Sequence, residues 1–280
     1  MQVGVVAHPK KERAKTVAEK VIREIGEIDG LDVVVSELTF DLLGNKDIEV
    51  QPLEEMKANA IMCIGGDGTI LRVLRLSNCP VLGINAGSLG FLTEVQPKDT
   101  KDALIRIIEG KYTVEKRTKI SVVLNGTKIA DVSNEVVLTA ITPSKIQNYE
   151  LNIDMVTSER IRSDGIIVST PTGSTGYAMS AGGSIIEPKL KAFQIVPIAP
   201  FMMNMRPYII PDSYMISMKL VGKTREANLV LDGSIVKKID KEDDILLTKS
   251  KFTADFIKFD TPFYQRYKEK IAEMDNRQEL

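Results

Sequence analysis

The first hundred residues alternate between two patterns of apolar and polar positions. Short apolar runs, which are typical of buried strands, occur at residues 3–7, 33–35, 61–64 and 81–84. Between them, apolar residues recur at helical spacing, in one stripe from Ala14 to Ile25 and another from Ile70 to Leu74. Because strands that alternate with helices form parallel sheets with crossover connections, this pattern predicts an α/β domain.

Beyond about residue 113 the apolar period changes to two, the period of a strand with one buried face. Residues 120–124 and 214–220 show this alternation clearly. The dipeptides Asn125-Gly126 and Asp232-Gly233 follow such runs, and both are typical of two-residue hairpin turns. This half therefore predicts antiparallel strands in a β-sandwich or a pair of packed sheets.

The chain has 280 residues, enough for two domains at roughly 150 residues each. We divide it into an α/β domain at 1–98, a β-sandwich domain at 99–250 and a C-terminal tail at 251–280. From Pro262 the tail is polar and favours a helix, with Phe263, Tyr264 and Tyr267 available to dock it. The predicted fold class is thus α/β plus all-β.

Composition and charge exclude several classes of function. Lys and Arg number 37 against 38 Asp and Glu, a net charge of -1, which argues against nucleic acid as a partner. His8 is the single histidine, so a His-rich metal site is unavailable and a Ser-His-Asp triad would need His8. Cys63 and Cys79 are too few for a disulfide framework, which favours a reducing compartment. No apolar run approaches the roughly 18 residues of a membrane span, and the first is too short for a signal peptide, so we expect a cytosolic protein.

The segment Gly65-Gly66-Asp67-Gly68-Thr69 lies between the predicted strand at 61–64 and the helix that follows it. Glycines there let a ligand approach the backbone closely, and the amides at a helix start bind phosphate. Asp67 is the informative residue, because a carboxylate repels phosphate. Two interpretations stay open: Asp67 holds a metal or takes a proton from an attacking hydroxyl, or it caps the helix.

Two further segments are rich in glycine or hydroxyl groups. The cluster from Gly83 to Leu92 follows the next strand, so both glycine loops should emerge at the carboxyl edge of the sheet, where open α/β sheets bind ligands. The segment from Arg162 to Gly183 is crowded with hydroxyls and glycines, which suits a sugar or a phosphate-bearing ligand. The alternatives are an ordinary turn and a solvated loop. Asn134-Glu135 is by itself typical of an exposed polar pair.

Taken together, these segments resemble the NAD kinase family. Its pattern GGDGTxL occurs at Gly65–Leu71, NxGxLGFL at Asn85–Leu92, the NE pair at Asn134-Glu135 and SDGxxxSTPTGSTxY at Ser163–Tyr177. GGDGT alone also occurs in lipid kinases of the diacylglycerol type and, in variant form, in 6-phosphofructokinases. Four motifs in the family's order are far more specific than GGDGT alone. The STPTGST segment discriminates the NAD kinase family from these other kinases. Gly176 is a departure, since alanine is common at that position in the family.

The resemblance implies a phosphotransferase that moves a phosphoryl group from ATP, or from polyphosphate, to the 2′-hydroxyl of the adenosine ribose of NAD, which yields NADP. It implies Asp67 as the general base with Gly68 beside it. It also implies Asn134 and Glu135 on the ribose of NAD, and Asp164 near the nicotinamide carboxamide. The other nucleotide-binding positions that it implies are Arg72, Lys145, Arg162, Thr172, Thr175, Gly176, Tyr177, Ala178, Met179 and Ser180.

Phosphoryl transfer also calls for a divalent cation, which we expect to be Mg²⁺ held mostly by phosphate oxygens and water, with no metal-ligating side chain assigned. The family implies a nucleotide-binding α/β domain, a β-sandwich that binds NAD, a tail that returns to the first domain, and a homodimer or homotetramer. Two rival functions stay open: a lipid or sugar kinase that shares only the GGDGT loop, and a non-catalytic pyridine-nucleotide sensor. Asp67 argues against the sensor, because a sensor needs no base.

Overall fold

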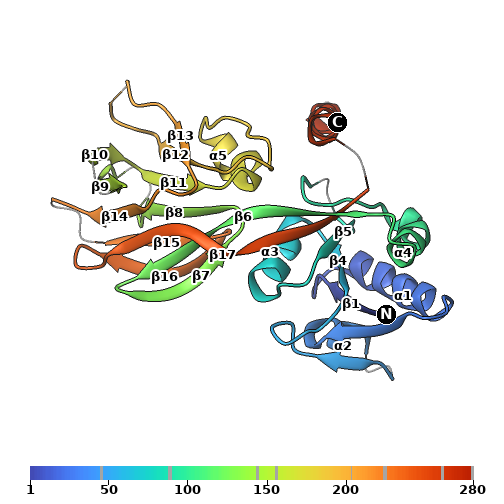
Figure 1. Ribbon diagram of the computed structural model, residues 1–280. Helices are drawn as coiled ribbons and strands as arrows, with labels where there is room; N and C mark the ends of the chain where they lie inside the picture. Colours follow the sequence, from blue (N-terminus) through green and yellow to red (C-terminus); the bar gives the residue numbers. More distant parts are fainter. Residues whose placement is uncertain are drawn as a thin grey trace. The chain divides into compact units, whose positions relative to one another are not determined.

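The computed structural model describes residues 1–44, 47–87, 90–142, 145–154, 157–202, 204–222, 226–259 and 262–278. The chain forms two units, one of Met1–Lys116 with Ala254–Leu280 and the other of Arg117–Thr253. Figure 1 shows the elements of both, coloured along the sequence. The first unit is discontinuous in sequence, because the end of the chain belongs to it, as the family resemblance implies for the tail.

The first unit is built on a parallel sheet with the strand order β3-β2-β1-β4-β5, and the end of β17 pairs with β5. The strands are β1 (Gln2–Ala7), β2 (Asp32–Ser36), β3 (Glu49–Gln51), β4 (Ala60–Gly65), β5 (Val81–Asn85) and β17 (Ile245–Lys258). From β1 the chain adds β2 and β3 on one side of β1, and then adds β4 and β5 on the other side. The strand order therefore reverses between β1 and β4. Ligands of open α/β sheets bind at the carboxyl ends of the strands at such a switch point.

Helices bury both faces of this sheet. They are α1 (Glu12–Gly26), α2 (Glu37–Leu43), α3 (Asp67–Leu76) and α4 (Thr100–Ile108), and α6 (Phe263–Gln278) follows β17. The predicted stripe on α1 packs with Val3 and Met62 in one core, and Ile70 of α3 packs with Val6 and Ile61 in another. Successive residues of a strand point to opposite faces, so β1 and β4 serve both cores. Full burial of each such aliphatic side chain contributes about 1.5–3 kcal/mol.

The boundaries of the units differ from the predicted ones. Helix α4 falls within the range 99–250 assigned to the β-sandwich, yet Ala103, Leu104 and Ile107 pack into the core that contains α1. The first segment of the unit therefore extends to Lys116 rather than 98, and its second segment begins at Ala254 rather than 251.

The second unit consists of two antiparallel sheets that share one core. One has the order β10-β9-β14-β17 with β6 paired to β17 and β7, and the other has the order β13-β12-β11-β8-β15-β16. Tyr149 and Leu151 of the first sheet and Leu138 and Phe193 of the second are fully buried in the common core. The predicted β-sandwich is confirmed. Its strands are β6 (Thr113–Leu124), β7 (Thr127–Val132), β8 (Glu135–Ala140), β9 (Gln147–Ile153), β10 (Thr157–Ser163), β11 (Gly165–Ser169), β12 (Ala192–Ile198), β13 (Tyr208–Pro211), β14 (Ile216–Leu220), β15 (Glu226–Leu231) and β16 (Ser234–Asp240).

Both predicted hairpin turns are present. Asn125 and Gly126 join β6 to β7 with φ of 50° and 78°, and Asp232 and Gly233 join β15 to β16 with φ of 46° and 75°. Positive φ at both central residues is the mark of a type I′ turn, whose twist matches that of the flanking strands. The short helical turns of the chain are η1 (Pro97–Asp99), η2 (Thr172–Thr175) and α5 (Tyr177–Ser180).

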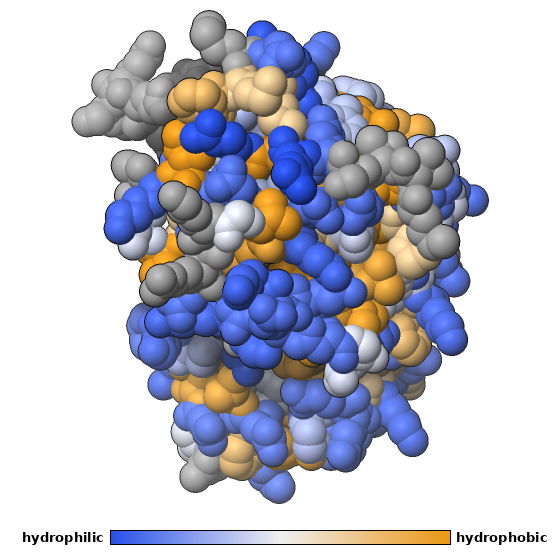
Figure 2. Space-filling view, turned by 90° about the vertical axis from the view of Figure 1, so that its left-hand side faces the viewer, coloured by the Kyte–Doolittle hydropathy of each residue, from blue (hydrophilic) through white to orange (hydrophobic). Residues whose placement is uncertain are grey.

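Polar and charged side chains cover most of the face shown in Figure 2, with apolar residues in smaller patches between them. The most exposed large apolar residues among those described lie apart along the chain: Leu190 before β12, Phe201 after β12 and Tyr264 on α6. Scattered residues of this kind are ordinary on a folded protein. Among the described residues, no helix is both long enough and apolar enough to cross a membrane.

Candidate active site

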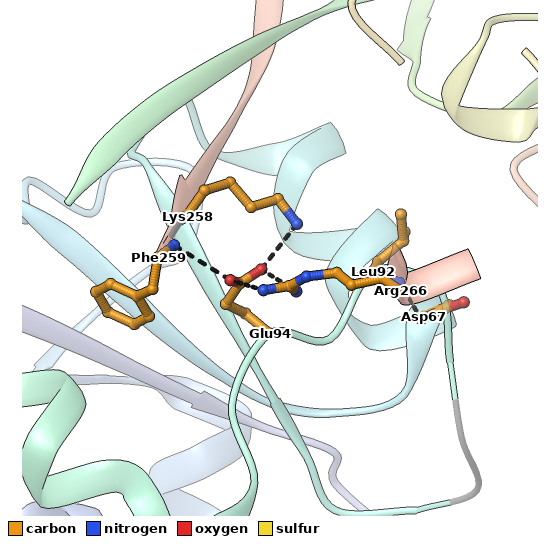
Figure 3. Close-up of polar contacts among 6 residues, drawn as sticks. All are labelled: Asp67, Leu92, Glu94, Lys258, Phe259 and Arg266. Carbon is orange, nitrogen blue, oxygen red and sulfur yellow. Dashed lines mark hydrogen bonds and ion pairs between the residues drawn. The ribbon is translucent and has the colours of Figure 1, made fainter. Parts of the chain in front are cut away.

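Asp67 stands where β4 ends and α3 begins. Gly66 is the N-cap of α3, and no side chain forms a capping bond there. The carboxylate of Asp67 instead accepts the backbone N–H of Phe91 at 2.8 Å through Oδ2 and that of Leu92 at 3.0 Å through Oδ1. The contact with Leu92 is drawn in Figure 3. The capping interpretation of Asp67 is therefore wrong: its side chain joins the first glycine-rich loop to the second.

Gly90 makes room for this carboxylate. A Cβ atom on Gly90 would lie 2.1 Å from Oδ1 of Asp67, and a Cβ on Gly65 would lie 2.4 Å from Oγ1 of Thr69. Both distances are far shorter than van der Waals contact, so side chains at these positions would displace the loop. Gly65 of the GGDGT motif and Gly90 of the NxGxLGFL motif thus have a steric reason within the chain itself. Ser88 and Leu89 of the second motif lie outside the described residues.

A pocket of about 590 Å³ opens beside Asp67 at the carboxyl ends of β1, β2 and β4. Its walls come from residues 6–11 around the end of β1, from 36–38 after β2, and from Gly66 to Thr69 after β4. One side of α3 completes it, together with Leu53 and Glu54, which follow β3. This is the switch point of the sheet, and the sequence predicts a ligand site along the same edge.

The pocket combines basic, apolar and open backbone surfaces. Apolar side chains of the lining include Leu38, Leu53, Val73 and Leu76. Basic ones are His8, Lys10, Lys11 and Arg72, and acidic ones are Glu37, Glu54 and Asp67. A Cβ atom on Gly66 or Gly68 would meet nothing within 4 Å, so the backbone of the loop is open to a ligand. Such a lining suits a molecule that carries both a flat apolar ring and phosphate groups.

The sequence predicts Asp67, Gly68 and Arg72 at this place, and the structure brings them together in one pocket. His8 and the two lysines after it are not predicted. The available signal is a basic stretch directly after the first strand, at the edge where the loops of the sheet converge.

In the second unit, Asp232 fixes the backbone that leads into β8. Its Oδ1 accepts the N–H of Asn134 at 2.7 Å and of Glu135 at 3.2 Å, and its Oδ2 accepts the N–H of Ser133 at 2.9 Å. The hairpin turn between β15 and β16 therefore has a second role, which its sequence does not reveal. Asn134-Glu135 is not the exposed pair that the dipeptide alone suggests, since Glu135 is 7% exposed.

Several buried polar atoms beside this backbone have no hydrogen-bond partner among the described residues. They include Oδ1 of Asn134, Oε2 of Glu135 and Oγ1 of Thr172. Burial, and after it the charge of Asp232, raises the pKa of Glu135 to about 8. Glu135 is then protonated at neutral pH and can donate a hydrogen bond. Because buried polar atoms are normally paired, the chemistry of this group suits a ligand that bears hydroxyls.

The predicted run from Thr175 to Ser180 lies on η2 and α5. Tyr177 is 46% exposed and Ser180 is exposed, while Thr175 and Met179 are partly buried. The side chain of Ala178 packs in a small core, so a contact between Ala178 and a nucleotide would involve its backbone.

Gly176 lies next to the Asn134-Glu135 pair. A Cβ atom on Gly176 would lie 3.2 Å from Oε2 of Glu135 and 3.5 Å from Nδ2 of Asn134. Alanine, which is common here in the family, fits only if the neighbouring atoms shift by a few tenths of an ångström. The structure thus brings Asn134, Glu135, Thr172 and Gly176 together.

The other predicted positions of this unit lie at the ends of strands. Asp164 links β10 to β11, and its backbone carbonyl accepts the hydroxyls of Tyr149 and Thr139, both at 3.2 Å. The guanidinium of Arg162 lies over the ring of Phe201, 4.5 Å from its centroid. Lys145 is exposed between β8 and β9.

A buried ion-pair cluster joins β17 and α6 to the segment after the second glycine loop (Figure 3). Glu94, whose side chain is 2% exposed, accepts Nζ of Lys258 at 2.9 Å, the N–H of Phe259 at 3.2 Å and both terminal nitrogens of Arg266. Burial alone would raise the pKa of Glu94, but the two cations outweigh it and lower the pKa. The sequence gives no sign of this cluster, because its members are as far apart as 172 residues.

Aromatic contacts hold α6 to the same segment. Tyr267 stacks on Phe91, with 6.2 Å between the ring centroids, and Phe263 lies against Tyr267 at 6.3 Å. Of the three aromatic residues expected to dock the tail, Tyr264 does not serve this purpose, since it is 53% exposed. Helix α6 is therefore fixed to Phe91, the residue whose N–H binds Asp67.

Family descriptions match both halves of this molecule. The ATP-NAD kinase N-terminal domain matches residues 3–112, and the ATP-NAD kinase C-terminal domain matches residues 133–259. The fold and the pocket thus define a kinase. The NAD kinase of Thermococcus kodakarensis is 42% identical over 275 residues, which cover 97% of this chain and 99% of that protein. The chain belongs to the NAD kinase family, and the predicted family and function are confirmed.

The solved structures that resemble this one include two kinases with bound nucleotides. The NAD kinase from Archaeoglobus fulgidus in complex with ATP has a TM-score of 0.78 and 31% identity, over 96% of this chain and 98% of that one. Yeast NADH kinase complexed with NADH has a TM-score of 0.84 and 24% identity, over 92% of this chain and 83% of that one. The yeast structure supports the fold alone. The predicted two-part fold is confirmed, and similarity along nearly the whole chain excludes a kinase that shares only the GGDGT loop.

Proposed function

We propose that this chain transfers the γ-phosphoryl group of ATP to the 2′-hydroxyl of the adenosine ribose of NAD, which gives NADP and ADP. A bond forms between the ribose oxygen and the γ-phosphorus, the bond from that phosphorus to the bridging oxygen of ADP breaks, and the hydroxyl proton passes to Asp67. Membership of the NAD kinase family and the resemblance to an NAD kinase that binds ATP support this reaction. The observation that carries the role of Asp67 is its fixed carboxylate beside an open glycine loop.

The surroundings of Asp67 suit a general base. Each carboxylate oxygen accepts one backbone N–H and has lone-pair capacity for a further hydrogen bond, so the group can still receive a proton. The two bonds also hold the carboxylate in one orientation before the substrates arrive. A general base contributes a factor of roughly 10² to 10⁴ in rate, or about 2.7–5.5 kcal/mol of barrier.

Mg²⁺ is proposed as the divalent cation of the reaction. The described residues contain no group of three or more His, Cys, Asp or Glu side chains that could hold a metal ion. Mg²⁺ does not need such a cage of protein side chains, because it keeps several waters and binds substrate phosphates. Bound to ATP, the ion would neutralise charge on the triphosphate, while the chain supplies Arg72 and the loop amides.

We place NAD against the second unit. The unpaired oxygens of Asn134, Glu135 and Thr172 suit the ribose hydroxyls, and protonated Glu135 can donate to one of them. The rest of the dinucleotide is assigned by family resemblance to the remaining predicted positions: Lys145, Arg162, Asp164, Thr175, Gly176, Tyr177, Ala178, Met179 and Ser180.

We also propose that the protein is a cytosolic homodimer or homotetramer. Cys63 and Cys79 are both free thiols, which suits a reducing compartment. Light scattering during size-exclusion chromatography should give the mass of two or four chains, and the mass of one chain would contradict the proposal. A fluorescent fusion expressed in the native host should show a diffuse cytosolic signal.

Asp67→Asn tests the assignment of the base. The variant should stay folded and bind NAD, yet lose 10²- to 10⁴-fold in kcat for NADP formation, because an amide does not accept the proton. Circular dichroism and calorimetric titration with NAD provide the controls. If the folded variant keeps more than about a tenth of the wild-type kcat, Asp67 serves only to hold the second glycine loop.

An assay of wild-type NADP formation tests the reaction itself. Purified protein is supplied with Mg²⁺, with NAD or NADH as acceptor, and with ATP or polyphosphate as donor, and we expect turnover with NAD and ATP. Tight NAD binding without turnover under any of these conditions would favour the non-catalytic sensor instead.

A further inference from the structure

Lys270 on α6 carries a buried ammonium group that forms no hydrogen bond or ion pair with the described residues. The residue is 8% exposed, and its Nζ has no hydrogen-bond partner among the described residues. The Nζ atom lies 5.3 Å from the centroid of the Phe91 ring. Burial of an unpaired ammonium is unfavourable, and buried charges in proteins are paired as a rule. A lysine that departs from this rule beside a reactive centre points to a partner that arrives with the substrate.

The helix that carries Lys270 is firmly held. Arg266, one turn earlier on α6, binds Glu94, and Tyr267 stacks on Phe91. Phe91 in turn donates its N–H to Asp67. One short segment therefore positions both the lysine and the carboxylate of the general base.

The charges around Lys270 do not balance. The charged groups that act on it are Asp67, Glu94, Lys258 and Arg266. Glu94 is already bound by Lys258 and Arg266, and both oxygens of Asp67 accept backbone N–H groups. Three cations against two carboxylates leave one positive charge in excess next to the GGDGT loop. An anion with several oxygen acceptors would offset this charge.

We propose that Lys270 donates hydrogen bonds to phosphate oxygens of ATP at the GGDGT loop and thereby stabilises the phosphoryl group in transfer. The assignment rests on the proposed reaction, in which ATP phosphates must lie next to Asp67. Lys270 then complements Arg72 and the loop amides from the C-terminal end of the chain. Its burial would strengthen the interaction, since charge-assisted hydrogen bonds gain strength away from water.

Three variants of the full chain test this role. Lys270→Met removes the charge and keeps the bulk, and Lys270→Arg keeps a charge. Lys268→Met is the matched control, because Lys268 is an exposed lysine of the same helix. Steady-state assays with ATP varied should give an approximately 100-fold loss of kcat/KM for Lys270→Met, as for loss of one donor to transition-state charge. We expect partial rescue by Lys270→Arg and a change below about twofold for Lys268→Met.

Thermal melting separates this role from a structural one. Without nucleotide, Lys270→Met should melt at the wild-type temperature or above, because an unpaired buried charge is removed. With ATP and Mg²⁺, it should gain less in melting temperature than wild type. Loss of stability with kcat/KM for ATP unchanged would overturn the proposal. If the wild-type protein forms no NADP, the proposed reaction is wrong. The role of Lys270 is then tested separately: it would be overturned if ATP raised the melting temperatures of wild type and Lys270→Met equally.

The dependence of wild-type kcat/KM for ATP on pH provides a test that requires no variant. Burial lowers the pKa of Lys270 to about 8, and the nearby cations Lys258 and Arg266 add to this effect against Asp67 and Glu94. Above that pH the free enzyme loses the ammonium, so kcat/KM for ATP should fall by up to about tenfold per pH unit. A profile that stays flat from about pH 7 to 10 would contradict the proposal.

Discussion

Replacement of Gly90 by alanine should displace the carboxylate of the general base, Asp67, although Asp67 itself is unchanged. The new Cβ would lie 2.1 Å from Oδ1 of Asp67, about 1.3 Å inside the 3.4 Å at which ordinary contact begins. The carboxylate cannot retreat freely, because Phe91 and Leu92 hold it at 2.8 and 3.0 Å. Either these hydrogen bonds lengthen or the second glycine loop moves.

Both outcomes have measurable sizes. A catalytic group misplaced by about 1 Å costs roughly 10²-fold in rate. A hydrogen bond to a charged group contributes about 1.5–3 kcal/mol, so loss of both would lower the free energy of unfolding by at least about 3 kcal/mol. We therefore expect Gly90→Ala to reduce kcat for NADP formation about 100-fold and to unfold at lower urea concentration.

A double-mutant cycle isolates the clash. In an Asp67→Ala background there is no carboxylate to displace, so Gly90→Ala should cost less than about 1 kcal/mol in urea unfolding. Gly26→Ala is the control, since a Cβ there meets nothing within 4 Å. Equal costs of Gly90→Ala in both backgrounds, or a kcat within threefold of wild type, would refute the steric reasoning.

Two further predictions concern pH and stability. The folded-state pKa of Glu135 lies near 8, above its usual 4.5, so the wild-type free energy of unfolding should fall relative to Glu135→Gln as pH rises from about 4.5 to 8. Parallel urea-unfolding curves for the two proteins across this range would contradict the raised pKa. Glu94→Gln leaves Lys258 and Arg266 without their carboxylate and should destabilise the protein by about 3–5 kcal/mol near pH 7. This difference should shrink as pH falls below about 4.5 through the lowered pKa of Glu94, while Glu27→Gln, in an exposed ion pair, should cost less than about 1 kcal/mol throughout.

Local patterns in the sequence predict much of the fold. Each of the four apolar runs lies within a strand of the parallel sheet, and the helical stripe at Ile70 to Leu74 lies on α3. The turn at Asn125-Gly126 is equally local, because positive φ at two successive residues favours these amino acids. Such features depend on neighbours a few residues away. The three-residue strand β3 has no such signal, since it is too short to show a period.

The sequence predicts the site less completely, because its chemistry depends on long-range partners. GGDGT indicates a ligand loop, but nothing in it shows that Asp67 binds the backbone of Phe91, 24 residues later. The turn residue Asp232 likewise holds the backbone of Asn134 from 98 residues away. Partners of this kind are selected by the packing of the whole unit. Lys270 shows the same limit, since a lysine on a polar helix ordinarily indicates a solvated face.

The first unit is made of two separate segments of the chain, and this affects how it folds during translation. Residues 117–253 emerge before the last part of β17, which begins at Ala254, and before α6. At roughly 5–20 residues per second they take about 7–30 s to make. During that time β5 lacks its neighbour, the end of β17, and Glu94 lacks its cations. An unpaired strand edge of this kind is a template for aggregation, so nascent chains should depend on holding chaperones during this interval. A translation product that stops within the second unit after Tyr177 would carry all four motifs and still lack α6, the helix that completes the surroundings of Asp67.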